Sequence, residues 1–339
     1  MLLSDEELAR KLQLEEEKQA TKSSTKSYVS SLFDRITGKV IDAQPIPRAA
    51  GVMMGNSNIN SKKPSVIMPE PVLLTFDAKL NFIADGYMML PAIIPTVLVR
   101  DALKFINMQI GGGIISPQLN LRHDPVTQFA TTGTDDPRIT NLLNETQLVE
   151  VIHSLLYGEY TYNYKSSLVR AHGAQIALRY PQEGNPPVTP TVNGYHIDGL
   201  DRAQHSTFNL LVGVCLSDTL EDYSGNLGIW PGSHHSIHDC IVRHRLPAQP
   251  KQFQVEEAAS KLRDIMGIDL GEPMQVKLIA GDAILVHQKV AHRGMPNYSP
   301  HIRNMIYFRI SHERLAAATD EEIWRNPFVF FAGLEEIYQ

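Results

Sequence analysis

The chain has 339 residues, and its hydrophobic content of 43% is ample for a large core. Two cysteines, Cys215 and Cys240, are too few for a disulfide framework and favour a reducing compartment. The formal net charge of −6 gives no electrostatic reason to expect a nucleic-acid partner, and no run approaches the about 18 apolar residues of a membrane span.

The N-terminal part predicts a flexible arm. Residues 1–19 begin with a capping box of Ser4 and Glu7 and predict a short acidic amphipathic helix. Residues 20–72 are rich in Ser, Thr, Lys, Asn, Gly and Pro, which is typical of a mobile linker. The first residues lack the basic and apolar segments of a secretory signal, so we expect a cytoplasmic protein.

A compact domain is predicted over residues 73–335, with helices first and strands later. Asp85-Gly86-Tyr87 indicates a helix end, a glycine turn and a strand, and further helices are predicted from Pro95 and over residues 139–156. Strand-like runs between turn residues then cover residues 174–178, 207–216, 226–229, 275–279, 283–287 and 304–310. This order predicts a mainly β fold with flanking helices, a jelly roll of the cupin-like kind.

The pattern His196-x-Asp198 is the first candidate for chemistry. Positions i and i+2 of a strand point to the same face, so the two side chains can aim at one point. An imidazole and a carboxylate that converge make two thirds of a 2-His-1-carboxylate set, which holds Fe(II) with open positions. Because His-x-Asp is frequent by chance, this interpretation depends on a third ligand downstream.

His287 and His292 are the candidates for that third ligand. His292 is favoured because residues 294–300 are dense in turn formers and return the chain to Arg303 near it. A buried arginine near a metal needs an anion, and its planar fork matches a carboxylate bidentately. 2-Oxoglutarate, which chelates iron at one end, would require such an anchor at the other.

The ordered set of motifs resembles the phytanoyl-CoA dioxygenase family. The similarity spans roughly residues 73–311 and rests on several short segments. In chain order they are Asp85-Gly86-Tyr87 through Pro91, His196-x-Asp198, Gly225-Asn226-Leu227-Gly228-Ile229-Trp230-Pro231-Gly232-Ser233-His234, Gly281-Asp282, His292 and Arg303.

The resemblance implies a double-stranded β-helix that uses Fe(II), 2-oxoglutarate and O2. It implies hydroxylation of a small-molecule or acyl substrate with release of succinate and CO2, and ascorbate is a candidate reductant. By position, His196, Asp198 and His292 would be the catalytic iron ligands, and Arg303 would hold the distal carboxylate of the cosubstrate.

One departure from the family pattern concerns the cosubstrate site. Many relatives have a serine two residues after the distal histidine, whereas this chain has Gly294. Another donor must substitute, and Thr207, Asn209 and Gln175 are the candidates. Arg179 lies where relatives tend to carry a lysine near the site.

Other residues near these motifs receive more ordinary interpretations. His234 is expected to be structural, His287 to pack beside the site, and Arg309 to lie behind it or on the surface. Residues 181–193 and 246–267 are expected to form walls of the substrate entrance.

Two alternatives of the same fold stay open, a non-redox zinc enzyme and an inactive binding protein. Residues 5–17 carry a Leu-Ala-x-x-Leu-Gln core between acidic residues and resemble the inverted ubiquitin-interacting motif. That helix would make a weak contact with ubiquitin or another protein, and a solvated arm is the rival interpretation. Neither a nucleic acid nor a membrane is expected as a partner.

Overall fold

The computed structural model describes residues 74–112, 128–158, 168–187, 194–198, 207–247 and 267–338. These residues belong to one compact unit within Met68–Gln339. The predicted acidic helix, the predicted linker and much of the two predicted entrance walls lie outside them and stay predictions. Within the described ranges, no helix is long and apolar enough to cross a membrane.

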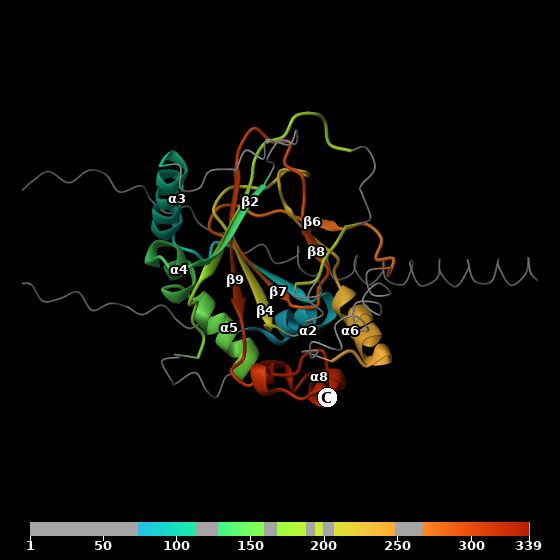
Figure 1. Ribbon diagram of the computed structural model, residues 1–339. Coiled ribbons are helices and arrows are strands. Elements are labelled where there is room, and N and C mark those ends of the chain that lie inside the picture. The colour runs from blue at the N-terminus through green and yellow to red at the C-terminus, as the bar shows by residue number, and fades with distance from the viewer. Residues whose placement is uncertain are drawn as a thin grey trace, which may run out of the picture. The chain divides into compact units, whose positions relative to one another are not determined.

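Two antiparallel sheets form the body of this unit (Figure 1). The larger sheet has six strands in the order β1 (Tyr87–Leu90), β7 (Ala283–His287), β4 (Leu210–Cys215), β9 (Arg303–Ile310), β3 (Ala174–Arg179) and β2 (Gln128–Thr134). The smaller sheet has the order β6 (Met274–Val276), β5 (Leu227–Ile229) and β8 (His292–Gly294). Strands that are far apart in sequence thus lie side by side, which confirms the predicted jelly-roll architecture with flanking helices.

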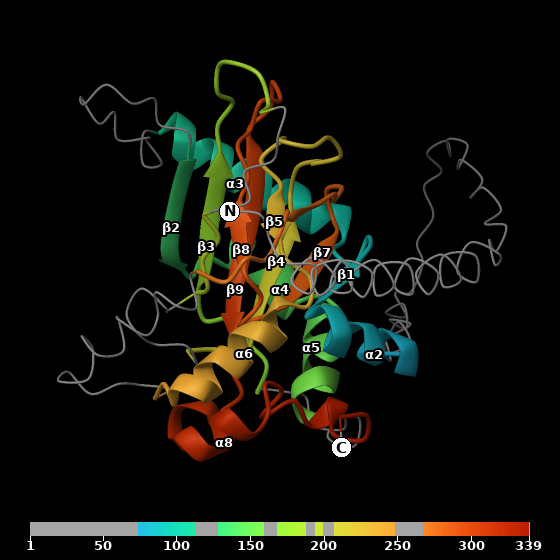
Figure 2. The same ribbon diagram turned by 90° about the vertical axis from the view of Figure 1, so that its right-hand side faces the viewer.

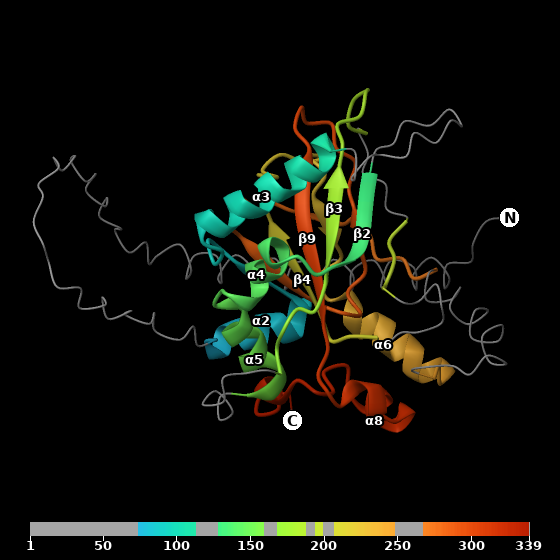
Figure 3. The ribbon, with the colours of Figure 1, turned by 60° about the vertical axis from the view of Figure 1, so that its left-hand side comes forward.

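Helices cover the face of the large sheet that points away from the small sheet (Figures 1 and 3). They are α3 (Thr96–Gly111), α4 (Pro137–Asn144) and α5 (Leu148–Tyr157). Helix α2 (Phe76–Asp85) lies apart from them at one end of the sheet, where Phe82 packs against Phe328 and Phe331 (Figures 1 and 2). The single helical region predicted over residues 139–156 is therefore two helices. The break follows Asn144, whose amide leaves the helix to bond the backbone of Ala171 at 3.1 and 2.9 Å.

The remaining short elements lie toward one end of the sheets (Figure 2). They are α6 (Ser233–His244), α8 (Asp320–Arg325) and two 3₁₀ turns, η4 (Leu315–Ala317) and η5 (Ala332–Leu334). Gly232 precedes α6 with a φ of 76°, which explains why the Trp-Pro-Gly-Ser-His segment turns a corner there.

The central strands are buried on both faces, and alternate residues serve two different cores. On β4 and β9, Val212 and Phe308 pack under the helices, while Leu211 and Tyr307 pack between the two sheets. This double burial explains the nearly continuous apolar run of β4 in the sequence. It also means that one face of the large sheet looks directly into the space between the sheets, where a site can be formed.

The Gly281-Asp282 turn ties the first strand to the sheet. Gly281 has a φ of 104°, and the buried carboxylate of Asp282 accepts hydrogen bonds from the backbone N–H groups of Ala92 at 2.8 Å and Ile279 at 2.9 Å. The turn therefore fixes the start of β7 against the end of β1. The Gly281-Asp282 motif thus has a structural role and supplies no group to the site.

We expect Asp282→Ala to lower the free energy of unfolding by about 1–3 kcal/mol, because two backbone N–H groups lose hydrogen bonds to a buried charged acceptor. Urea denaturation of the full chain measures the difference. Asp222→Asn is the matched control, since its pair with Lys277 at 3.2 Å is exposed and should be worth less than about 1 kcal/mol. Equal losses in the two variants would contradict this role of Asp282.

Candidate functional site

A backbone bridge brings the two predicted histidine ligands together. The N–H of His196 donates to the carbonyl of His292 at 2.9 Å, and the N–H of His292 donates back at 3.0 Å. Side chains of such a directly opposed pair lie on the same face, and the two rings are 4.3 Å apart.

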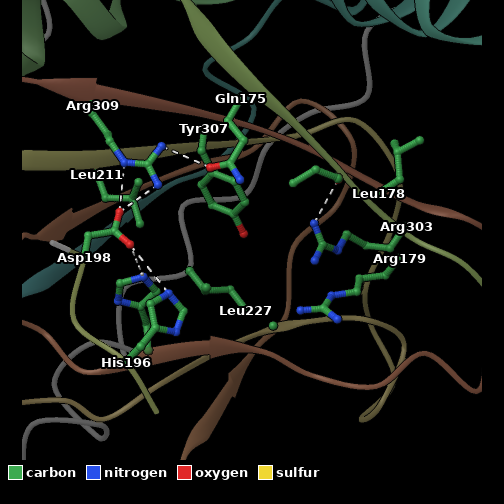
Figure 4. Close-up of a pocket in the computed structure, with 13 residues that line it drawn as sticks. Gln175, Leu178, Arg179, His196, Asp198, Leu211, Leu227, Arg303, Tyr307 and Arg309 are labelled. Carbon is green, nitrogen blue, oxygen red and sulfur yellow. Dashed lines mark hydrogen bonds and ion pairs between the residues drawn. The ribbon is translucent and has the colours of Figure 1, made fainter. Parts of the chain in front are cut away.

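Asp198 joins them from the same face, two residues after His196. Its Oδ1 lies 3.5 Å from Nε2 of His196 and 3.7 Å from Nε2 of His292 (Figure 4). Within the described ranges, these three residues form the only group of histidine, cysteine and acidic side chains that could hold a metal ion.

The hydrogen bond of His292 fixes which of its nitrogens is free. Its Nδ1 lies 2.9 Å from the carbonyl oxygen of Val290, and because a carbonyl only accepts, Nδ1 must carry the proton. In the neutral ring, Nε2 then presents a lone pair toward Asp198. Such a backbone partner behind the ring is typical of metal-ligating histidines.

The three donor atoms fit a metal ion. Atoms about 2.1 Å from one ion and at right angles to each other would be about 3.0 Å apart, so the 3.5 and 3.7 Å separations from Asp198 would need to shrink by about 0.5 and 0.7 Å. A bare imidazole nitrogen next to a carboxylate oxygen is also unfavourable unless a cation lies between them. The set of two histidines and one carboxylate is the one that non-haem Fe(II) enzymes use.

Arg309 holds the other oxygen of the carboxylate. Its Nε and Nη2 contact Oδ2 of Asp198 at 2.9 and 2.7 Å, and its Nη1 donates to the amide oxygen of Gln175 at 3.0 Å. Burial raises the pKa of Asp198, but charged and hydrogen-bonding neighbours, among them the guanidinium group of Arg309, outweigh burial and hold this pKa well below its usual range. Asp198 is thus ionised, with Oδ1 left for a metal.

The triad lies at one end of a cavity of ≈ 220 Å³ between the sheets (Figure 4). One face of two neighbouring strands supplies most of its polar lining, because alternate residues of a strand share a face. This lining consists of Gln175 and Arg179 from β3 and Arg303, Tyr307 and Arg309 from β9. Leu211, Leu227 and Ala177 add apolar walls.

Two arginines occupy the other end of the cavity. Arg303 is only 4% exposed, and its Nε and Nη1 donate to the carbonyls of Gly225 at 2.7 Å and Ala177 at 3.1 Å. Arg179 lies directly opposite Arg303 in the β3–β9 register. Burial, followed by the charge of Arg303, lowers the pKa of Arg179 to about 10, so Arg179 stays charged at neutral pH. Burial also lowers the pKa of Arg303.

Gly225, from the Gly-Asn-Leu-Gly segment, is required by this packing. It has a φ of 79°, and a side chain there would lie 2.9 Å from Cβ of Arg303 and 3.1 Å from Cβ of Arg179. The start of the Gly-Asn-Leu-Gly segment therefore packs directly against the side chains of the two arginines.

The structure places the three predicted cosubstrate donors differently. Gln175 lines the cavity, although its amide oxygen is taken by Arg309. Asn209 is outside the lining, and its amide bonds the backbone of His312 at 2.7 Å and Val329 at 3.5 Å. Thr207 is exposed and also outside the lining.

Two further histidines lie outside the cavity lining, and both rings pack against Phe328, away from the triad's cavity. His287 donates from Nε2 to the carbonyl of Pro327 at 2.8 Å and accepts from the N–H of Lys289 at 3.1 Å, so it is neutral and fully bonded. His234 contacts the carbonyl of Ile83 at 3.0 Å, and burial, together with the charge of neighbouring groups, lowers its pKa to about 3.

Sequence reasoning missed Tyr307, and it left Arg309 either behind the site or on the surface, whereas the structure places Arg309 behind Asp198. The signal was present, because Arg303, Tyr307 and Arg309 share the parity of one strand face. The partner of Arg309 could not be found in this way, since it depends on how the segment of Asp198 approaches β9.

Arg309→Gln should weaken binding of divalent metal by about 10–100-fold, as is usual when an outer partner of a metal ligand is lost. The reason is that Asp198 would then be free to rotate. Titration of the metal-free protein with Co(II), followed by absorption, gives the affinity. Arg243→Gln on the exposed face of α6 is the control and should bind Co(II) like the natural chain. Unchanged affinity in Arg309→Gln would show that this ion pair does not orient Asp198.

Lys289 gives a pH-dependent prediction. It is 3% exposed, no hydrogen bond or acidic partner for its ammonium group is present in the described part of the chain, and burial lowers its pKa to about 8. The unfolded chain, with a pKa of about 10.4, holds this proton more tightly, so stability rises as pH increases between the two values and the full cost persists below pH 8.

We therefore expect Lys289→Met to raise the free energy of unfolding at pH 7 by about 1–3 kcal/mol and to flatten its rise between pH 8 and pH 10. Urea denaturation across this pH range tests both effects. Lys277→Met, at an exposed lysine, should change neither. Loss of stability at pH 7 in Lys289→Met would contradict the burial of an unpaired charge.

No protein-family model matches the chain, and no curated protein matches it. Among solved structures, the non-heme alpha ketoglutarate dependent epimerase SnoN from nogalamycin biosynthesis is 15% identical, with 69% of this chain and 81% of SnoN covered and a TM-score of 0.43. The carbocyclase SnoK of the same biosynthesis is also 15% identical, with 73% and 91% covered and a TM-score of 0.41. AviO1 from Streptomyces viridochromogenes Tue57 is 15% identical, with 68% and 91% covered and a TM-score of 0.43. Similarity at this level does not transfer a function, so membership of the phytanoyl-CoA dioxygenase family stays a prediction.

Proposed function

We propose that the chain is an Fe(II)- and 2-oxoglutarate-dependent oxygenase that hydroxylates a small molecule. One observation carries the proposal: a single cavity has a His/Asp/His triad at one end and two arginines at the other, Arg303 buried and Arg179 partly buried. A ligand that suits both ends must chelate a metal and carry a distant negative charge. 2-Oxoglutarate is a common metabolite with both properties.

The charges that line the cavity support a dianionic ligand. Arg179, Arg303 and Arg309 face it, and Asp198 is the only carboxylate among the described residues that line it. Because Asp198 is engaged by Arg309, the other two guanidinium groups have no acidic partner in the described part of the chain. Buried cations without an anion are unfavourable, so they point to a ligand that supplies the negative charge.

With three protein ligands, Fe(II) would keep three positions for a bidentate 2-oxo acid and O2, and would supply oxidative decarboxylation to succinate and CO2 coupled to hydroxylation of the substrate. The chain's own residues position the reactants. Arg303 is held rigidly by two carbonyls, so its remaining N–H groups can orient a carboxylate without rearrangement. Leu211, Leu227 and Ala177 would give the middle of the cavity an apolar lining against the carbon chain of the 2-oxo acid.

The open side of the triad indicates where the substrate would enter. The His196 side chain is 57% exposed, whereas His292 is buried. A substrate that approaches past His196 would reach the metal from the opposite direction to the two arginines. The arginines also argue against a zinc hydrolase, since hydrolysis needs no dicarboxylate.

The test is to load the purified full chain with Fe(II) without oxygen, measure 2-oxoglutarate binding by calorimetry, and then admit O2 and measure succinate. We expect saturable binding that requires the metal, and succinate release that Zn(II) does not support. His292→Ala should lose more than the about 100-fold in metal affinity that an outer partner contributes, and should form no succinate. Arg243→Gln should behave like the natural chain. If Fe(II)-loaded protein does not bind 2-oxoglutarate, the proposed function is wrong.

A further inference from the structure

We propose that Arg179 is a second anchor for the distal carboxylate of the cosubstrate, admitted to the cavity by the missing side chain of Gly294. The inference rests on the proposed function and deepens it. It implies that a pair of arginines, and not one arginine with a hydroxyl group, selects a 2-oxo acid that ends in a carboxylate.

The position of Arg179 is the first support. Arg179 and Arg303 are directly opposite residues of adjacent strands, so their side chains leave the sheet on the same face and enter the same cavity (Figure 4). Like charges in directly opposed positions are destabilising. A ligand that accepts hydrogen bonds from both guanidinium groups would convert this repulsion into binding.

Gly294 is the second support. A Cβ built on Gly294 would lie 2.8 Å from both Cζ and Nε of Arg179 and would collide with its Nη2. The backbone of Gly294 is outside the left-handed region, so any residue could adopt it. The absence of a side chain at Gly294 therefore leaves space that the guanidinium group of Arg179 fills, and an added side chain would have to displace that group.

The lack of any other partner is the third support. No hydrogen bond or ion pair of the Arg179 guanidinium is present in the described part of the chain, although burial and the charge of Arg303 both oppose its charge. Arg303, in contrast, already donates to two carbonyls. Arg179 thus has more donors available for a ligand than the residue that the sequence predicted as the anchor.

A purely structural role is the rival explanation, in which Arg179 only fills the space beside Gly294. The two explanations differ in what they predict for ligands. A filler would affect stability and all 2-oxo acids alike. An anchor would affect only those 2-oxo acids that carry a distal carboxylate.

The experiment compares 2-oxoglutarate with 2-oxopentanoate, which has the same carbon chain but ends in a methyl group. Both are titrated by calorimetry into the full chain loaded with Fe(II) without oxygen. In Arg179→Gln we expect an affinity for 2-oxoglutarate about 10–100-fold lower, the usual effect of losing hydrogen bonds to a charged group, with 2-oxopentanoate within about 2-fold. Arg243→Gln, an equal loss of charge on the exposed face of α6, should change neither affinity.

A second variant leaves Arg179 in place and closes its space. Gly294→Ser should displace the guanidinium group and reproduce the selective loss of 2-oxoglutarate affinity. In the double variant with Arg179→Gln, the loss should be smaller than the sum of the two single losses, because both act through the same group. Arg179→Lys, which keeps the charge but not the fork, should give an intermediate loss.

The outcomes separate this inference from the proposed function. If the natural chain binds 2-oxoglutarate and Arg179→Gln binds it equally well, or loses both ligands by the same factor, the inference is wrong and the proposed function stands. If the natural chain does not bind 2-oxoglutarate at all, both are wrong. Additive losses in the double variant would also contradict the coupling of Arg179 to Gly294.

Discussion

The reciprocal pair of backbone hydrogen bonds between His196 and His292 is the interaction on which the site depends. It joins a short segment to the edge of the small sheet and sets both imidazoles on one side. Asp198 reaches the same side because it follows His196 by two residues, and Arg309 then fixes its rotation from the large sheet. The metal-binding group is thus held by main-chain pairing of His196 with His292 and by the side-chain contact of Asp198 with Arg309.

The features of this arrangement that depend on local sequence patterns could be predicted. The two-residue spacing of His196 and Asp198, the strand runs and the glycine turn at Gly86 follow from backbone geometry, and the structure contains all three. Strands β2 and β8 and helix α6 were not predicted. β8 has only three residues, and α6 begins with polar histidines that hide its periodicity.

The replacement for the serine that is absent at Gly294 could not be predicted from the sequence. Three hydroxyl or amide residues were proposed from their place in the sequence, and two of them lie outside the cavity. The space that a side chain at position 294 would fill is occupied by the guanidinium group of Arg179. Arg179 is on another strand, so the register of β3 against β9 had to be known first.

The alternation along β9 constrains how this protein can change. Tyr307 and Arg309 face the cavity, while Ile306, Phe308 and Ile310 fill the core beneath the helices. A deletion or insertion of one residue in this strand would exchange the two sets, sending charged groups into the core and apolar ones into the site. A change of one residue in the length of β9 would therefore disrupt both the core and the site. New substrate preferences would have to arise from point substitutions on the cavity face or from loops that leave the strand intact.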